Sequence, residues 1–332
     1  MAKKKSHPSS AAKQREQQGH QPQGSKQRSA QQTRNRRKMR RSSSRGLWFT
    51  LGSVVVAIAA IVGVFIYLSN QSSSPNAMYP LTSANPAIVK EITTVNPSLL
   101  AEVGTGSGKV LNPPTKLNGA SSLSGPTGKP EVFYEGAEYC PNCAAERWSM
   151  IVALSRFGTF HNLSQERSSS TDVDPNTPTF SFYRSSYSSQ YIDFVPLEHE
   201  GYRSIILETP TADEQQLINM YNPSQGYPFI DVANTYLFSG ASYDPAVLSD
   251  LDWQSIAVSL SDPQSPIARC ILGTANYLTA TICESTNQQP AGVCKAAPIP
   301  QIEQSLAKAS GNTSGQNGVP NLYEPMASLR VW

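Results

Sequence analysis

Two cysteines separated by two residues, Cys140 and Cys143, lie between two segments with contrasting patterns. A short apolar run at 132–134 precedes them, and a run with apolar residues three and four positions apart follows at 144–157. The first pattern is typical of a buried strand and the second of an amphipathic helix. The sequence therefore predicts a strand, a tight turn and a helix, with both thiols where the helix begins.

A thiol at the start of a helix has a specific chemical character. Helix N–H groups and the positive end of the helix dipole stabilise a thiolate, so we expect the pKa of Cys140 to be lowered. Cys143 lies about one turn further along the same face, where it can reach Cys140 and form a disulfide. We therefore interpret the pair as a thiol–disulfide redox site, in which Cys140 exchanges with a partner and Cys143 resolves the mixed disulfide.

Neighbouring residues act on this thiolate in opposite directions. Pro141 removes one N–H donor and Glu138 places a negative charge nearby, whereas the remaining amides at the start of the helix favour the thiolate. The reduction potential of such a pair depends largely on how strongly its thiolate is stabilised. The sequence therefore leaves both directions open, oxidation and reduction of a partner.

Other uses of a Cys-x-x-Cys motif fit this sequence less well. A structural zinc site usually needs a second pair of ligands, and the four histidines are scattered along the chain, at 7, 20, 161 and 199. A c-type haem needs a histidine directly after the second cysteine, where this chain has Ala144. A purely structural disulfide would close almost no loop and would add little stability. We expect no metal ion and no cofactor.

Three further cysteines follow at 270, 283 and 294. The segment 267–283 has a helical pattern, which would separate Cys270 from Cys283 by about 20 Å, too far for a disulfide. Cys283 and Cys294 enclose a short loop with a proline and a glycine, so we prefer this pair as a structural disulfide. For Cys270 we favour a buried, inert thiol over a covalent link to a partner.

A stretch without any charged residue, 47–68, follows a strongly basic segment. As a helix it would reach about 33 Å, enough to cross the apolar core of a bilayer. Trp48 and Tyr67 lie near its ends, where aromatic rings favour the interface. The run is longer than the apolar region of a usual signal peptide, and no convincing cleavage site follows it. We therefore predict a single transmembrane helix that acts as a signal anchor.

Charge is distributed unevenly on the two sides of this span. Residues 1–46 contain 14 Lys and Arg against one acidic residue, whereas residues 47–332 contain 13 against 23. Because basic segments stay on the cytoplasmic side, we expect a cytoplasmic N-terminus and an extracytoplasmic domain at the cell membrane, where disulfides persist. For the basic cluster at 34–45 we favour contact with the lipid bilayer over binding of nucleic acid.

Composition divides the chain into five segments. The first, 1–46, has almost no apolar residues and is expected to be disordered. The others are the transmembrane helix at 47–68, an extracytoplasmic linker at 69–128 that contains a short helix, a globular domain at 129–300 and a C-terminal tail at 301–332.

Local patterns predict the elements of the globular part. We expect strands at 179–183 and 191–195, a loop at 164–178, a helix at 213–221 capped by Thr211, a hairpin around Ala233-Asn234, helices at 245–260 and 267–283, and a last helix at 301–309. Gly158 is expected to end the helix that follows the cysteines, and Pro228 lies where the first strand of the hairpin begins.

The segment around the cysteines resembles the thioredoxin superfamily, in which a Cys-x-x-Cys pair follows a strand and opens a helix. Tyr227-Pro228 is similar to the cis-proline of that superfamily, which packs beside the cysteine pair and helps to bind the substrate chain. Longer motifs resemble an uncharacterised membrane-anchored family, domain of unknown function 929, at 136–148, 153–158, 276–283 and 293–294. These resemblances imply an α/β fold, with a thioredoxin-like domain that carries inserted and C-terminal helical elements.

One position departs from the thioredoxin pattern. Thioredoxin-type proteins carry a buried acid six residues before the first cysteine, where this chain has Tyr134. Glu135 would point to the opposite face of the strand. Glu146 is a candidate proton acceptor in its place, although a surface pairing with Arg147 or Arg156 accounts for it equally well.

These observations predict a membrane-anchored thiol–disulfide oxidoreductase that acts on cysteine-containing protein substrates, with a membrane protein as a candidate redox partner. Cys140 and Cys143 would be catalytic, and the resemblance assigns contact with the substrate chain to Tyr139, Pro141, Tyr227 and Pro228. The alternative is a non-catalytic, membrane-tethered thioredoxin-like binding domain in which the cysteines form only structural disulfides. No nucleic-acid partner is expected.

Overall fold

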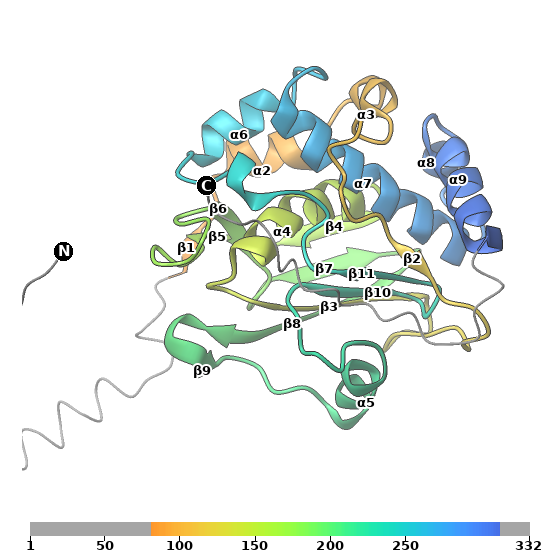
Figure 1. The fold of residues 1–332 in the computed structure, drawn as a ribbon, viewed down its shortest axis with the longest axis horizontal. Helices are drawn as coiled ribbons and strands as arrows, with labels where there is room; N and C mark the ends of the chain where they lie inside the picture. Colours follow the sequence, from red (N-terminus) through yellow and green to blue (C-terminus); the bar gives the residue numbers. More distant parts are fainter. Residues whose placement is uncertain (1–80, 313–332) are drawn as a thin grey trace, which may run out of the picture. The chain divides into compact units, whose positions relative to one another are not determined.

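The computed structural model describes residues 81–312, which belong to one of the two units of the chain, Ser69–Trp332. The predicted cytoplasmic tail and transmembrane helix lie outside the described residues. Between residues 81 and 312, no helix combines the length and the apolar character that a membrane crossing requires. The described part is a mixed α/β structure with a central sheet and helices on both of its faces (Figure 1).

The central sheet has six strands in the order β2-β11-β10-β3-β8-β9. Their bounds are β2 (Thr115–Lys116), β3 (Glu131–Ala137), β8 (Asp193–Gly201), β9 (Ile205–Ile206), β10 (Phe229–Val232) and β11 (Tyr236–Ser239). β3 and β8 are parallel, and the other neighbouring pairs are antiparallel. Every residue of β3 is buried, because the strand lies inside the sheet and helices cover both faces.

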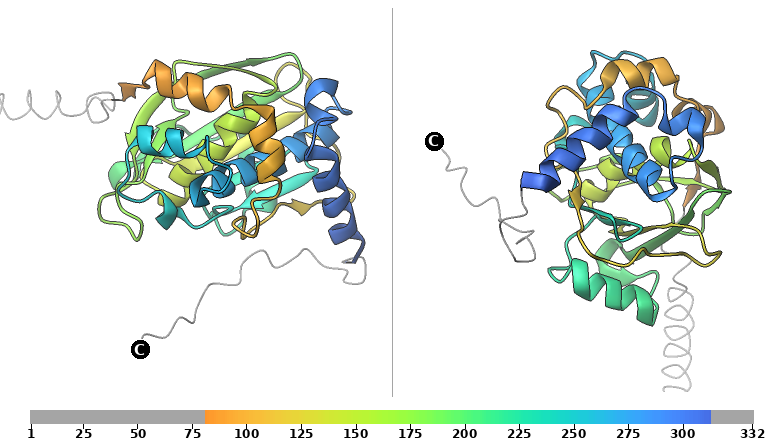
Figure 2. Two further views of the ribbon diagram at one scale, coloured as in Figure 1. Left: turned by 90° about the horizontal axis from the view of Figure 1, so that it is seen from above. Right: turned by 90° about the vertical axis from the view of Figure 1, so that its right-hand side faces the viewer.

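Helices divide between the two faces of this sheet (Figures 1 and 2). One face carries α5 (Ala212–Tyr221), and the other carries α4 (Pro141–Leu154) and α7 (Pro266–Ser285). Around α4 and α7 lie α2 (Pro86–Thr93), α3 (Pro97–Val103), α6 (Trp253–Ser259), α8 (Ala291–Cys294) and α9 (Ile299–Asn312). The larger apolar core lies between the sheet and these helices, and a smaller one lies between the sheet and α5.

Additional strands lie between α4 and β8. They are β4 (Gly158–His161), β5 (Ser164–Arg167), β6 (Pro178–Ser181) and β7 (Ser186–Ser189). β4 pairs with β7, while β5 pairs with β6 and with β1 (Thr82–Ser83). The prediction of a loop throughout 164–178 was wrong at β5, since its polar residues are held by pairing on both sides rather than by an apolar face.

The folded structure begins before the predicted boundary at residue 129. Asn85 and Asn96 cap α2 and α3, and each helix has a proline in its first turn. Buried side chains of both helices belong to the larger core: Ile88, Ile92, Leu100 and Val103. The Asn276 amide of α7 donates hydrogen bonds to the carbonyls of Leu100 and Gly104, at 2.8 and 2.9 Å. Part of the predicted linker is therefore core structure.

The folded region also extends further toward the C-terminus than predicted. α9 runs from Ile299 to Asn312, so the expected helix at 301–309 is part of a longer one. Ile302 and Leu306 are buried in the core, which places the start of the predicted tail within the packed structure.

Several predicted elements were confirmed and others were wrong in detail. α3, α5 with its Thr211 cap, the hairpin β10–β11 and α7 agree with the sequence patterns. The predicted helix at 245–260 is instead a short 3-10 turn (Pro245–Val247) followed by α6, because the backbone of Asp250 is left-handed and Asp252 begins a new helix.

Gly158 does not end α4, which stops at Leu154; it begins β4 instead. An added Cβ at Gly158 would lie 2.4 Å from the carbonyl oxygen of Ser188. This glycine is therefore required by the close approach of two strands. The strand expected at 191–195 begins at Asp193 and continues to Gly201, because it pairs with the whole of β3.

We predict that Gly273→Ala destabilises the fold. Gly273 of α7 faces Gly106, and an added Cβ would lie 2.7 Å from the Cα atom of Gly106, so backbone must move. Overpacking of this kind costs about 1–3 kcal/mol, which urea unfolding of the purified chain will measure. Gly292→Ala is the matched control, since no atom lies within 4 Å of its added Cβ. Equal stability of the two variants would contradict the prediction.

Candidate active site

The two cysteines lie where β3 gives way to α4. β3 ends at Ala137, Cys140 is the N-cap of α4, and Pro141 is its first residue. The missing N–H of a proline costs nothing there, because the first amides of a helix have no helical partner. The Cys140 sulfur takes the role of a capping oxygen and accepts a hydrogen bond from the Cys143 amide at 3.3 Å. The predicted strand, turn and helix are therefore confirmed.

Burial distinguishes the two thiols. Cys140 is 8% exposed and Cys143 is fully buried. The Cys143 sulfur lies deeper, where it accepts a hydrogen bond from the Ala137 amide at 3.5 Å. An incoming sulfur can therefore reach Cys140 before it can reach Cys143.

The same geometry separates the pKa values of the pair. A hydrogen bond with the Cys143 thiol lowers the pKa of Cys140, and amide hydrogen bonds and Arg147 lower it further against the effect of burial. Burial raises the pKa of Cys143 well above the usual thiol value, and the hydrogen bond with Cys140 adds to this effect. These shifts favour ionisation of the outer thiol and keep the proton on the inner one.

The residues expected beside the pair are brought to it by the sheet. β10 is antiparallel to β3, and Pro228, joined to Tyr227 by a cis peptide bond, directly precedes it. The carbonyl of Tyr227 accepts a hydrogen bond from the Cys140 thiol at 3.9 Å. Tyr139 and Tyr227 pack against the cysteines, so the residues expected to contact a substrate lie together at one end of β3 and β10.

Part of the site was not predicted from the sequence. His199 and Glu200 come from β8, next to β3. The Tyr139 hydroxyl donates to the Glu200 carboxylate at 3.3 Å, and the Tyr227 hydroxyl lies 3.1 Å from His199 Nδ1. From the sequence, these two residues could have been placed in the site only by extending the strand predicted at 191–195 toward residue 200.

A buried ion pair lies behind the cysteines. Arg147 of α4 is fully buried, and Glu198 of β8 accepts two of its hydrogen bonds, at 2.9 and 2.6 Å. Glu138 and Glu166 also lie within 4.0 Å of this guanidinium. The alternative of a surface pairing between Glu146 and Arg147 is excluded, because α4 is buried on nearly all sides.

Glu146 was likewise assigned to a surface pairing as one of two alternatives. It is fully buried and accepts hydrogen bonds from the backbone and hydroxyl of Ser242, both at 2.9 Å. Burial raises its pKa to about 7. Within the described residues, no hydrogen bond links Glu146 or Ser242 to Cys140 or Cys143. The structure therefore gives no contact through which Glu146 could accept a proton from either thiol.

Tyr134, the residue at the position of the thioredoxin acid, is fully buried and packs edge-on against Phe182, with ring centroids 5.3 Å apart. Glu135 lies on the other face of β3, as expected, where Asn222 donates to it at 3.0 Å and His199 lies 3.5 Å away. Neither residue replaces the missing acid next to Cys143.

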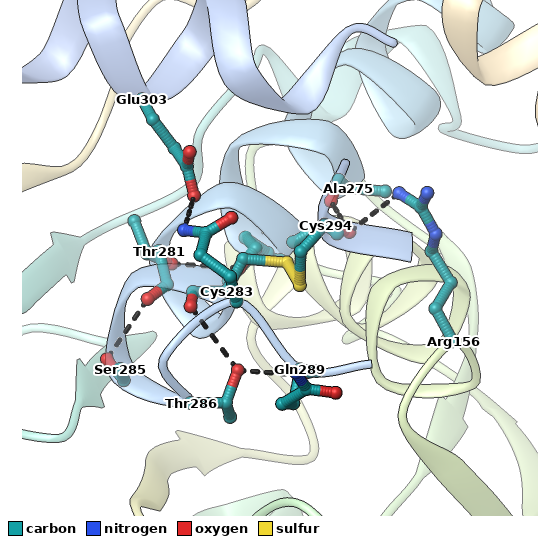
Figure 3. The surroundings of a disulfide bond; sticks show 12 residues. Arg156, Ala275, Thr281, Cys283, Ser285, Thr286, Gln289, Cys294 and Glu303 are labelled. Atoms are coloured by element: carbon teal, nitrogen blue, oxygen red, sulfur yellow. Dashed lines mark hydrogen bonds between the residues drawn. A yellow bond between two sulfur atoms is a disulfide. The ribbon is translucent and has the colours of Figure 1, made fainter. Parts of the chain in front are cut away.

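A disulfide joins Cys283 and Cys294, the pair preferred from the sequence, with Cα atoms 5.4 Å apart (Figure 3). It connects α7 to α8, and hydrogen bonds close to it fix the intervening loop: Thr286 donates to the carbonyl of Gln289 at 2.7 Å, and Gln288 donates to Glu303 at 2.7 Å. Cys270 is a buried free thiol, and burial raises its pKa to about 11. It is poorly reactive in this state.

Among residues 81–312, no group of three or more His, Cys, Asp or Glu side chains is arranged to hold a metal ion.

Comparison with known proteins gives a match to a family model over part of the chain. Residues 120–284 match the model of a family described as Domain of unknown function (DUF929), which supports the resemblance to that family seen in the sequence. The match includes the cysteine pair, β8 and Pro228. No curated protein and no solved structure matches the chain.

We predict that Cys143→Ala raises the pKa of Cys140. Loss of the hydrogen bond from Cys143 removes stabilisation of the thiolate, and a hydrogen bond to a charged group corresponds to about one pKa unit or more. Alkylation by iodoacetamide, followed by mass spectrometry from pH 4 to 10, will report this pKa. The measurement uses a Cys270→Ala background, so that no other free thiol of the described region reacts. An unchanged profile would exclude the thiol–thiol hydrogen bond.

We predict that removing the disulfide with Cys283→Ala and Cys294→Ala together lowers the free energy of unfolding by about 3 kcal/mol, since the cross-link closes a loop of 11 residues. Unfolding in urea measures the change. Cys270→Ala is the control, because it also removes a buried sulfur but no cross-link. A double variant as stable as this control would show that the disulfide contributes no net stability.

Proposed function

We propose that this chain, with its DUF929 segment, is a membrane-anchored extracytoplasmic thiol–disulfide oxidoreductase that acts on cysteine-containing protein substrates. Cys140 and Cys143 are its catalytic residues, and the reaction needs no cofactor. The observation that carries the proposal is the difference between the two thiols at the start of α4: Cys140 keeps 8% of its surface exposed and has a lowered pKa, whereas Cys143 is fully buried and has a raised one.

A thioredoxin-like fold for residues 129–300 is part of this proposal. The parallel strands β3 and β8 are joined by a connection that contains α4, and a Cys-x-x-Cys motif at such a βαβ unit is typical of thioredoxin-like redox proteins. The cis peptide bond before Pro228 is the second feature that the resemblance implies. In this interpretation, β4 to β7 are the inserted structure and α7 to α9 are the C-terminal helices.

The reaction follows from the order in which the thiols are reached. The Cys140 thiolate attacks one sulfur of a substrate disulfide, so that the substrate S–S bond breaks and a mixed disulfide forms. The released substrate thiolate takes up a proton. Cys143 then loses its proton and attacks the Cys140 sulfur, which releases the second substrate thiolate and leaves a Cys140–Cys143 disulfide. The substrate gains two electrons and the pair loses two.

The same steps run in reverse when the pair starts as a disulfide and the substrate as a dithiol. A substrate thiolate then attacks Cys140, and the pair ends reduced. In either direction a second redox partner must restore the starting state. A membrane protein is the partner that fits a tethered domain.

Substrate contacts are assigned to the residues that surround Cys140. Tyr139 and Tyr227 offer aromatic surface, and Pro141 and Pro228 flank the reactive sulfur. The Tyr227 carbonyl already lies next to Cys140, so an extended substrate chain can bind alongside it through backbone hydrogen bonds. The cellular location rests on the apolar segment 47–68 and the basic segment before it.

A Cys143→Ala, Cys270→Ala variant is expected to trap the mixed disulfide, because no inner thiol remains to resolve it. Incubation with a disulfide-linked peptide dimer should give a stable adduct of one peptide on Cys140, detected by mass spectrometry. The chain with only Cys270→Ala should release both peptides and form its own disulfide.

Replacing Cys140 by alanine as well should abolish the adduct. If the Cys143→Ala variant forms no adduct, and if Cys140 has the pKa of an ordinary thiol in the chain that retains Cys143, the alternative of a non-catalytic, membrane-tethered binding domain replaces the proposal.

A further inference from the structure

Arg147 is a charged side chain in an unusual place. It lies four residues after Cys143 on α4, on the same side of the helix, and none of its surface is exposed. Transfer of a charge into a protein interior costs several kcal/mol, which neighbouring groups must offset. The contacts of this guanidinium therefore indicate what holds it beside the thiols.

Glu198 fixes the position of the guanidinium. Its two oxygens accept hydrogen bonds from Nε and Nη2 of Arg147 at 2.9 and 2.6 Å, a two-point contact that sets both distance and orientation. The backbone N–H of Phe182 donates to the same carboxylate at 3.3 Å. Burial opposes the charged form of Arg147, yet Glu198 and nearby groups raise its pKa, so the guanidinium stays protonated.

The guanidinium also contacts the turn that carries the cysteines. Nη2 of Arg147 donates to the carbonyl of Ala137 at 3.1 Å, and the amide of Cys140 donates to the same carbonyl at 3.2 Å. The N–H of Ala137 in turn donates to the Cys143 sulfur at 3.5 Å. Ala137 thus links Arg147 to both thiols.

Two more carboxyl groups face this guanidinium. Glu138 lies 4.0 Å and Glu166 3.5 Å from its nitrogens. Burial, followed by repulsion from Glu198, raises the pKa of Glu138 to about 8, so this group keeps its proton near neutral pH. A protonated Glu138 leaves more of the positive charge of Arg147 available to the thiols.

We infer that Arg147, held by Glu198, is a positioning residue for the cysteine pair: its buried charge stabilises the Cys140 thiolate, and its bond to Ala137 fixes the turn that presents this thiolate. The role in exchange rests on the proposed function, whereas the effect on the thiolate does not. Charge and geometry act together, since Arg147 favours the ionised form of both cysteines and also donates a hydrogen bond to the turn that carries them.

Variants in a Cys270→Ala background test this inference through the pH profile of Cys140 alkylation by iodoacetamide. Arg147→Met combined with Glu198→Met replaces both members of the ion pair by apolar side chains, so that neither is left without the other. The thiolate fraction at pH 6 should fall about tenfold, which corresponds to a pKa raised by about one unit. Arg147→Lys keeps the charge and should recover part of this loss.

Arg156→Met is the matched control. Arg156 follows the same helix, but it contacts Thr279 of α7 and not the turn of the cysteines. Its loss should leave the profile of Cys140 unchanged. A folded double variant with the Cys140 pKa of the parent chain would overturn the inference.

Where the double variant does not fold, Glu198→Gln combined with Glu138→Gln decides, because loss of Glu198 alone would lower the pKa of Glu138 and let its carboxylate neutralise Arg147 instead. Removing both carboxyl groups while Arg147 remains should lower the pKa of Cys140, and an unchanged or raised pKa would contradict the inference. These measurements use no protein substrate. They therefore stay informative even if no mixed disulfide is ever trapped, so failure of this inference and failure of the proposed function can be distinguished.

Discussion

The pairing of β3 is the constraint on which the site depends. This strand is parallel to β8 on one side and antiparallel to β10 on the other. The C-terminal end of β3, the last part of β8 and the entry of β10 therefore meet at one edge of the sheet. That edge brings the cysteine turn next to Tyr227, Pro228 and Glu200, which are distant in the sequence. A shift of either neighbour by one residue would turn its side chains to the other face of the sheet and separate these groups.

Helices on both faces of β3 have a second consequence. The region behind the cysteines is closed to water, so its polar groups must find partners inside the protein. Arg147 finds Glu198, and Glu146 finds Ser242. A buried ion pair adds little net stability compared with an apolar pair. The ion pair of Arg147 and Glu198 instead affects the geometry and the charge next to the two thiols.

The local features of the fold could be predicted because neighbouring residues determine them. Prolines, asparagines and Thr211 set the starts of α3 and α5, and the apolar spacing of α7 indicates one long helix. β5 and the extension of β8 could not be predicted in this way. Their residues are polar, and pairing with other strands makes them strands. The helices before residue 129 were predicted in part as local structure, but their burial depends on contacts with α7.

For the candidate site, the sequence alone determined the two cysteines at the start of a helix and favoured the disulfide between Cys283 and Cys294, because spacing of a few residues sets these relations. Only the tertiary structure decided that Arg147, Glu198, His199 and Glu200 lie around the pair, and that Glu146 does not face it. The physical reason is that burial and the pairing of distant strands fix which charges meet, and neither follows from local pattern. The thiol pair at the end of β3 is thus a property of the sequence, and the charge behind it is a property of the fold.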